Sequence, residues 1–284
     1  MKSKIQVGAV PYLNSKPLVQ GHESFLQEAD FVFAPPSQLS RMIGEGLVDV
    51  ALCSSIEYLR GGLDILPGVG VISRGAVNSV ILTSEKPVEQ AKTVNLDPSS
   101  LTSCALTGLW YWRFLKQDPQ FSRYPVESPE AKACDAQLAI GDLGLQRAGR
   151  FAHQLDLGAA WMEWTGSPFV YAVWLVRQES VLGSIGKYLM DAPKRVHKTI
   201  PQLAVEASEE LGLTNDLCVG YLTDSLQFTL DGEALIGLQR FLTLAAAEHH
   251  RLREIVPDLP ALGVEIPVTI NYHLDHPADQ SHEA

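Results

Sequence analysis

Short runs of β-branched and other apolar residues recur along the chain, and stretches with helical periodicity separate them. This alternation is the feature that most restricts the fold, because it is typical of α/β proteins with mainly parallel sheets. From residue 178 to 253 helical periodicity prevails, so strands are expected first and helices last. The strand-like runs span residues 5–10, 31–34, 48–53, 69–73, 77–83, 93–96, 137–140 and 169–176.

Two helix starts can be located from capping residues. Ser37 is expected to cap a helix whose apolar positions, at residues 39, 42, 43 and 47, follow the 3.6-residue period, and Gly44 and Gly46 allow it to stop before the next strand. A second capped helix is predicted to begin within residues 97–103, where Ser and Thr residues cluster.

The strands at 77–83 and 170–176 are long and separate blocks of unlike composition, so we expect them to cross between two lobes. The predicted first lobe combines residues 1–78 and 175–258, and the second spans 79–174. Residues 259–284 form a C-terminal extension, and its small polar end, from residue 277, should be frayed. Two crossings imply a cleft that closes on a ligand by hinge motion.

Composition excludes several classes of function. Lys and Arg number 22 against 33 Asp and Glu, a net charge of −11, and no basic block suits nucleic acid. No run approaches the roughly 20 apolar residues of a membrane span. The four cysteines never form a Cys-x-x-Cys pair, and the N-terminal apolar run is too short for a signal peptide. These observations favour the cytoplasm, with no membrane partner.

The sequence from Gly8 to Leu18, with Tyr12-Leu13-Asn14 and Pro17-Leu18, resembles the opening of the menaquinone-biosynthesis enzymes of the futalosine pathway. The resemblance is greatest to the chorismate dehydratase family, and it continues in order to about residue 245. Further matching segments are 36–39, 46–52, 57–59, 79–82, 96–106, 140–142, 156–158, 161 and 164–172.

This resemblance implies a two-lobed α/β fold like that of the type 2 periplasmic solute-binding proteins, with a hinge of two crossing strands. It also implies a lyase that removes water from the dicarboxylate chorismate to give 3-[(1-carboxyvinyl)oxy]benzoate. Because the product becomes aromatic, the enzyme mainly has to orient two carboxylates and polarise the leaving hydroxyl. We therefore expect no metal and no redox cofactor; the chain fits either a monomer or a homodimer.

Site residues are assigned within the matching segments and, for Ser54 and Ser55, between two of them. Thr102 and Ser103 are expected to bind a carboxylate, since a helix N-terminus offers free N–H donors and a positive dipole end. Ser54 and Ser55 follow a strand and should reach the cleft from the first lobe. One of the Ser or Thr residues at 99–103 can instead be a simple helix cap, and Ser54-Ser55 an ordinary turn.

The catalytic residues expected from the resemblance are Asn14, Ser79 and Asp142. The Asn14 amide can orient the reacting centre, and Ser79 can donate to the leaving hydroxyl or to a carboxylate. Asp142 is the available carboxylate for a general base, although a turn aspartate is an equally good interpretation. The alternative hypothesis is that one of the substrate's own carboxylates accepts the proton.

Two other functions remain open at this point. One is that of the sister enzyme of the pathway, 1,4-dihydroxy-6-naphthoate synthase, which is associated with a histidine base in the second lobe. Between Ser79 and Tyr171 the only histidine is His153, outside the segment where such a base is expected, and this favours the dehydratase. The other is a non-catalytic binding protein for a small anion, which would use the same helix start and hydroxyls.

Overall fold

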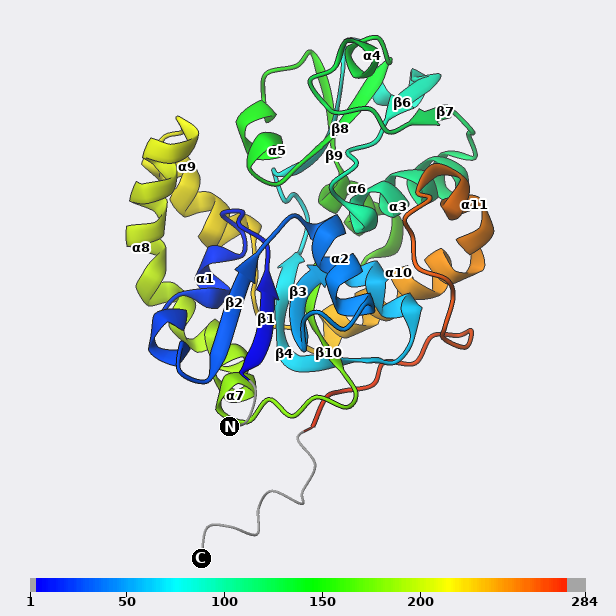
Figure 1. Ribbon diagram of the computed structural model, residues 1–284. Helices are drawn as coiled ribbons and strands as arrows, with labels where there is room; N and C mark the ends of the chain where they lie inside the picture. Colours follow the sequence, from blue (N-terminus) through cyan, green and yellow to red (C-terminus); the bar gives the residue numbers. More distant parts are fainter. Residues whose placement is uncertain (1–3, 275–284) are drawn as a thin grey trace, which may run out of the picture.

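The computed structural model describes residues 4–274, and these form two lobes, each built on a five-stranded sheet (Figure 1). The strands of the first sheet are, in spatial order, β2 (Ala29–Phe33), β1 (Ile5–Ala9), β3 (Val50–Ser54), β10 (Phe169–Arg177) and β4 (Leu63–Ser73). Those of the second sheet are β7 (Gln120–Ser122), β6 (Thr93–Asn95), β8 (Ala136–Ile140), β5 (Val80–Ser84) and β9 (His153–Asp156).

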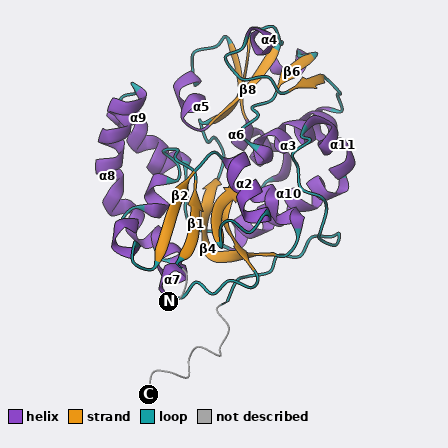
Figure 2. Ribbon diagram, in the orientation of Figure 1, coloured by secondary structure: helices purple, strands orange, loops and turns teal. Residues whose placement is uncertain are grey.

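Helices surround both sheets (Figure 2). With the first sheet are α1 (Lys16–Val19), η1 (His22–Phe25), α2 (Pro36–Gly44), η2 (Ser55–Arg60), α7 (Ser184–Met190), α8 (Ala192–Leu211), α9 (Asn215–Gly220), η5 (Tyr221–Ser225), α10 (Gly232–Ala247) and α11 (His249–Ile255). With the second are η3 (Val88–Gln90), α3 (Leu101–Leu109), η4 (Trp110–Leu115), α4 (Pro129–Lys132), α5 (Gly141–Arg147) and α6 (Leu157–Thr165). The helices α8 and α9 lie beside α1 on one side, whereas α10 and α11 lie on the other side, next to α3 (Figure 1).

The expected α/β alternation is confirmed, but the expectation of mainly parallel sheets is wrong. Within residues 4–274, four strand pairings are parallel and four are antiparallel. The antiparallel pairs all involve β10 or β5, the strands that follow the two passages of the chain between the sheets. Because each strand enters a sheet from the other lobe, it runs against its neighbours.

The passages between the lobes differ from those predicted. The chain leaves the first sheet after β4 and enters the second at Val80, so the first passage includes residues 74–79. Residues 170–176 do not cross: β10 pairs with β3 and β4 along its whole length, and the return passage lies before Phe169. The boundary proposed at residue 174 therefore falls inside a strand of the first sheet.

Helix α2 begins two residues earlier than predicted, and Ser37 is not its cap. Its first residue is Pro36, and Pro35 precedes it without a side-chain cap. Proline suits this position because its missing N–H has no partner in the first turn of a helix. The helix ends at Gly44, as expected, and Leu47 lies beyond it as an exposed side chain.

The structure describes residues 259–274 of the predicted C-terminal extension. Its backbone meets β4 where Ile65 N donates to Asn271 O (2.9 Å) and His273 N donates to Ile65 O (3.0 Å). The predicted frayed end, from residue 277, lies outside the described residues. No helix in residues 4–274 combines the length and the apolar character needed to cross a bilayer.

Candidate active site

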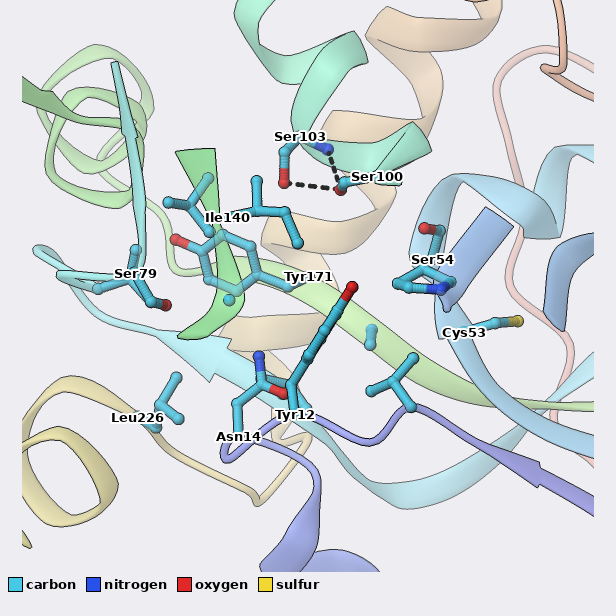
Figure 3. A pocket seen from close by; sticks show the side chains of 17 residues that line it. Tyr12, Asn14, Cys53, Ser54, Ser79, Ser100, Ser103, Ile140, Tyr171 and Leu226 are labelled. Atoms are coloured by element: carbon cyan, nitrogen blue, oxygen red, sulfur yellow. Dashed lines mark hydrogen bonds between the residues drawn. The ribbon is translucent and has the colours of Figure 1, made fainter. Parts of the chain in front are cut away.

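A cavity of about 570 Å³, counted with its mouth, lies between the two lobes (Figure 3). Apolar side chains from both lobes form much of its wall, among them Val10, Val80, Ile140 and Leu226. The polar or thiol side chains in the wall are Tyr12, Asn14, Cys53, Ser54, Ser79, Ser100, Ser103 and Tyr171.

Asn14 enters the cavity from the loop after β1 (Figure 3). Its Oδ1 atom is buried and has no hydrogen-bond partner among the described residues. An unpaired buried acceptor is costly, and a bound hydroxyl would remove that cost by donating to it. The structure thus places Asn14 where a substrate-orienting amide is expected.

Ser79 also faces the cavity, from the passage that leads into β5. Its Oγ accepts a hydrogen bond of 2.8 Å from the hydroxyl of Tyr221, which is itself buried. Burial raises the pKa of Tyr221 above its ordinary value, while hydrogen bonds with Ser79 and Asn14 act in the opposite direction. Tyr221 therefore keeps its proton and connects the two predicted catalytic side chains.

Four helices begin at the cavity wall. Pro36 is the first residue of α2, Ser54 precedes η2, Ser100 caps α3, and Gly141 is the first residue of α5. The first turn of a helix presents free N–H groups and the positive end of its dipole. Several such ends around one cavity favour an anionic ligand without any basic side chain.

At the start of α3, two hydroxyls form a chain of hydrogen bonds that leads into the cavity. Ser103 N donates to Ser100 Oγ (3.2 Å), and Ser100 Oγ donates to Ser103 Oγ (2.9 Å; Figure 3). This arrangement leaves the Ser103 hydroxyl hydrogen available to a ligand. Ser100 is thus the helix cap and also a lining residue, whereas at this helix start only Thr102 and Ser103 were predicted to bind the ligand.

Thr102 and Ser55 do not line the cavity. Thr102 Oγ1 accepts a hydrogen bond from Ile56 N (3.2 Å) and lies 3.4 Å from Ser55 Oγ, which donates to Val170 O (2.8 Å). Both side chains are buried and join the two lobes behind the site. Their neighbours Ser103 and Ser54 do line it, because successive residues of a helix or turn point in different directions.

Asp142 does not line the cavity either, although Gly141 does. Its Oδ1 accepts a hydrogen bond from Leu13 N (3.0 Å), in the loop that carries Asn14. Burial raises the pKa of Asp142, and the Leu13 N–H opposes this effect. The carboxylate is therefore committed to the backbone of the other lobe.

Three tyrosines at this site were not predicted from the sequence: Tyr12, Tyr171 and Tyr221. Tyr12 and Tyr171 line the cavity and lie within the matching segments, so the resemblance could have pointed to them. Burial raises the pKa of Tyr171 well above its ordinary value, and its hydroxyl lies 3.0 Å from Ser73 Oγ. Tyr221 lies in the helical part of the chain, where nothing in the sequence distinguishes it from a core residue.

The lining carries no formal charge: among the described residues it contains no Asp, Glu, His, Lys or Arg. His153 is exposed, in β9 beside Ser84, and is not part of the cavity. Within residues 4–274, no three His, Cys, Asp or Glu side chains gather as metal ligands would. The site can therefore bind and orient an anion through N–H groups, hydroxyls and one amide, but it offers no obvious general base.

Two lobes around a cavity that suits a small anion define the class of solute-binding-protein folds. The periplasmic aliphatic sulphonate binding protein of Escherichia coli has this fold, with a TM-score of 0.62, 15% sequence identity and coverage of 98% of both chains. Within this class, the chain belongs to the menaquinone biosynthesis family, whose sequence pattern it matches over residues 5–247.

Curated relatives of the chain carry a more specific name. The chorismate dehydratase of Thermus thermophilus is 27% identical over 258 residues, which cover 83% of this chain and 93% of the relative. The chorismate dehydratase of Campylobacter jejuni is 28% identical over 241 residues, which cover 83% and 91%. Both matches extend over nearly the full length of the relatives.

Proposed function

We propose that this protein dehydrates chorismate to 3-[(1-carboxyvinyl)oxy]benzoate in menaquinone biosynthesis. The family and the names of the two curated relatives support this activity. The observation that carries the proposal is the uncharged cavity bordered by four helix starts, since it suits a compact dianion that brings its own charge. All four cysteines are free thiols, which supports a reducing compartment such as the cytoplasm.

One carboxylate of chorismate binds at the start of α3. There it accepts hydrogen bonds from the Ser103 hydroxyl and from N–H groups of the first helical turn, which the helix itself does not use. The starts of η2, at Ser54, and of α5, at Gly141, lie at the same wall and favour the second carboxylate. Charge is thus compensated by dipoles that are fixed before the substrate arrives.

The reacting edge of the ring faces Asn14 and Ser79. Asn14 Oδ1 accepts a hydrogen bond from the ring C4 hydroxyl, which satisfies the unpaired buried acceptor. Ser79, held by Tyr221, donates its hydroxyl hydrogen to the oxygen that leaves. The contact from Ser79 strengthens as the C4–O bond breaks and negative charge develops on that oxygen, whereas Asn14 orients the hydroxyl before the bond breaks.

The proton acceptor is a carboxylate of the substrate itself. None of the described lining residues is a carboxylate, imidazole or amine, and Asp142 is bonded to Leu13 N outside the cavity. The ring C3 proton passes to a carboxylate oxygen, and the C3–H electron pair becomes the new ring double bond between C3 and C4. The C4–O bond breaks, and the oxygen departs as water with its own hydrogen and the proton that the carboxylate has taken from C3, so the carboxylate is ionised again in the product.

Purified protein incubated with chorismate tests the proposal. Chromatography with mass spectrometry should show an aromatic product lighter than chorismate by one water. Asn14→Ala should lower kcat/KM by about 100-fold or more, as expected when an orienting polar group is lost. The matched control is Asn215→Ala, at an exposed position in α9, which should behave like the wild type.

The same experiment separates the other two functions. Chorismate that binds but stays unchanged would support an anion-binding protein and would contradict the dehydratase. Formation of the aromatic product would exclude both the pure binding protein and the sister synthase as the main activity.

A further inference from the structure

The two sides of the junction between the lobes are built differently. On one side, α3 packs against η2, α10 and α11, and buried apolar side chains fill the space. On the other side, α5 faces the loop after β1 and the end of α8. The contacts there include two hydrogen bonds to backbone groups: Leu13 N donates to Asp142 Oδ1 (3.0 Å), and Gln146 Nε2 donates to Leu211 O (2.8 Å).

Asp142 fixes the middle of the loop that carries the site residues. Leu13 lies between Tyr12 and Asn14, and its side chain is fully buried in the first lobe. The rest of this loop is held from within the first lobe, because Ser15 Oγ donates to Tyr12 O (2.9 Å) and Leu18 N donates to Ser15 O (2.9 Å). The bond from Asp142 therefore ties the backbone next to Asn14 to the second lobe.

Tyr12 makes a second contact with the same helix start. Its ring lies against Gly141, where an added Cβ atom would come within 3.2 Å of Tyr12 Cδ2. Burial raises the pKa of Tyr12, and the side chain of Ser99, in the loop before α3, acts in the opposite direction. The loop after β1 thus touches the second lobe on both sides of the cavity.

We propose that Asp142 is a positioning residue that latches α5 of the second lobe onto the loop after β1 and thereby holds Asn14 in its working position. Gln146 supplies the second contact of this latch, through its hydrogen bond to Leu211 O. The role depends on the carboxylate as a hydrogen-bond acceptor and not on its capacity to take a proton from the substrate. The kinetic part of this inference rests on the proposed function, whereas the structural part does not.

The two possible roles of Asp142, hydrogen-bond acceptor or general base, predict different kinetics for two variants. Asp142→Asn keeps an oxygen that can accept from Leu13 N, whereas Asp142→Ala has none. For a latch, Asp142→Asn stays within about threefold of the wild-type kcat/KM, and Asp142→Ala loses about tenfold, mainly through KM, because substrate binding must then close the lobes unaided. For a general base, both variants lose about 100-fold to 10,000-fold in kcat.

Hydrogen exchange of the Leu13 amide in the ligand-free protein gives a readout that does not depend on chorismate. Exchange should be at least about tenfold faster in Asp142→Ala and close to wild type in Asp142→Asn. Asp49→Ala is the matched control, because Asp49 Oδ2 accepts from Gln6 N (2.8 Å) inside the first lobe, so Leu13 exchange should not change. If Asp142→Ala does not fold, Gln146→Ala provides the same test with a smaller expected effect.

Unchanged Leu13 exchange in a folded Asp142→Ala protein would overturn the latch. An Asp142→Asn variant as inactive as Asp142→Ala, with normal exchange, would overturn it in favour of a charged or basic role. If the wild type does not convert chorismate, the proposed function fails, and the exchange measurement still decides whether the latch exists.

Discussion

Replacing Tyr221 by Phe removes one hydroxyl from the hydrogen-bond network around the reacting centre. That hydroxyl donates to Ser79 Oγ over 2.8 Å, and both residues are buried, so no water can replace it without rearrangement. Leaving a buried partner unsatisfied costs about 1–3 kcal/mol. If the bond holds Ser79 in place for the leaving hydroxyl, the same range corresponds to a loss of about 5-fold to 150-fold in kcat/KM.

The assay is steady-state conversion of chorismate together with thermal unfolding. Tyr111→Phe is the matched control: its hydroxyl donates over 2.8 Å to Val88 O, it is equally buried, and it does not line the cavity. Both variants should lose stability, with a decrease in melting temperature of about 2–4 °C per kcal/mol in a chain near this size. Only Tyr221→Phe should lose activity. A Tyr221→Phe protein with kcat/KM within twofold of the wild type would refute the role given to this network.

Three more predictions concern single side chains. Ser103→Ala should raise KM for chorismate about 5-fold to 10-fold in steady-state assays, because one donor to the bound carboxylate is lost; an unchanged KM would contradict this contact. Gly141→Ala should lower the free energy of unfolding by about 1–2 kcal/mol in urea titrations, because Gly141 has φ +58° and faces the Tyr12 ring. Burial raises the pKa of Glu57, which is paired with Arg60, from 4.5 to about 7. The folded state therefore retains a proton that the unfolded state loses, so the unfolding free energy should fall as pH rises from about 4.5 to about 7. Glu57→Gln should flatten this fall in urea titrations at several pH values, and an identical slope in both proteins would contradict the assignment.

Apolar runs predicted the buried strands of both sheets best. The central strands β3, β8 and β10 are mainly apolar, and all three were predicted. The strands β7 and β9 were missed because they are short edges of the second sheet with partly exposed, mostly polar side chains. The direction of each strand could not be predicted from the sequence either, because it depends on the lobe from which the chain enters the sheet.

The site was predicted in part. Asn14, Ser79, Ser54 and Ser103 do line one cavity. Motif position identifies a segment near a site but not the direction of each side chain, which explains the assignment of Thr102, a residue that joins the lobes instead. Contacts between residues far apart in the chain, such as that of Tyr221 with Ser79, cannot be predicted from motifs.

The position of β10 has a consequence for biosynthesis of the chain. This strand separates β3 from β4 in the first sheet, yet the ribosome completes every strand of the second sheet before it makes β10. The second lobe, with all its strands between Val80 and Asp156, can fold as soon as it emerges. The nascent first lobe meanwhile exposes the facing edges of β3 and β4, which are open to wrong pairing. Protection by chaperones should matter most in that interval, until residue 177 has left the ribosomal tunnel.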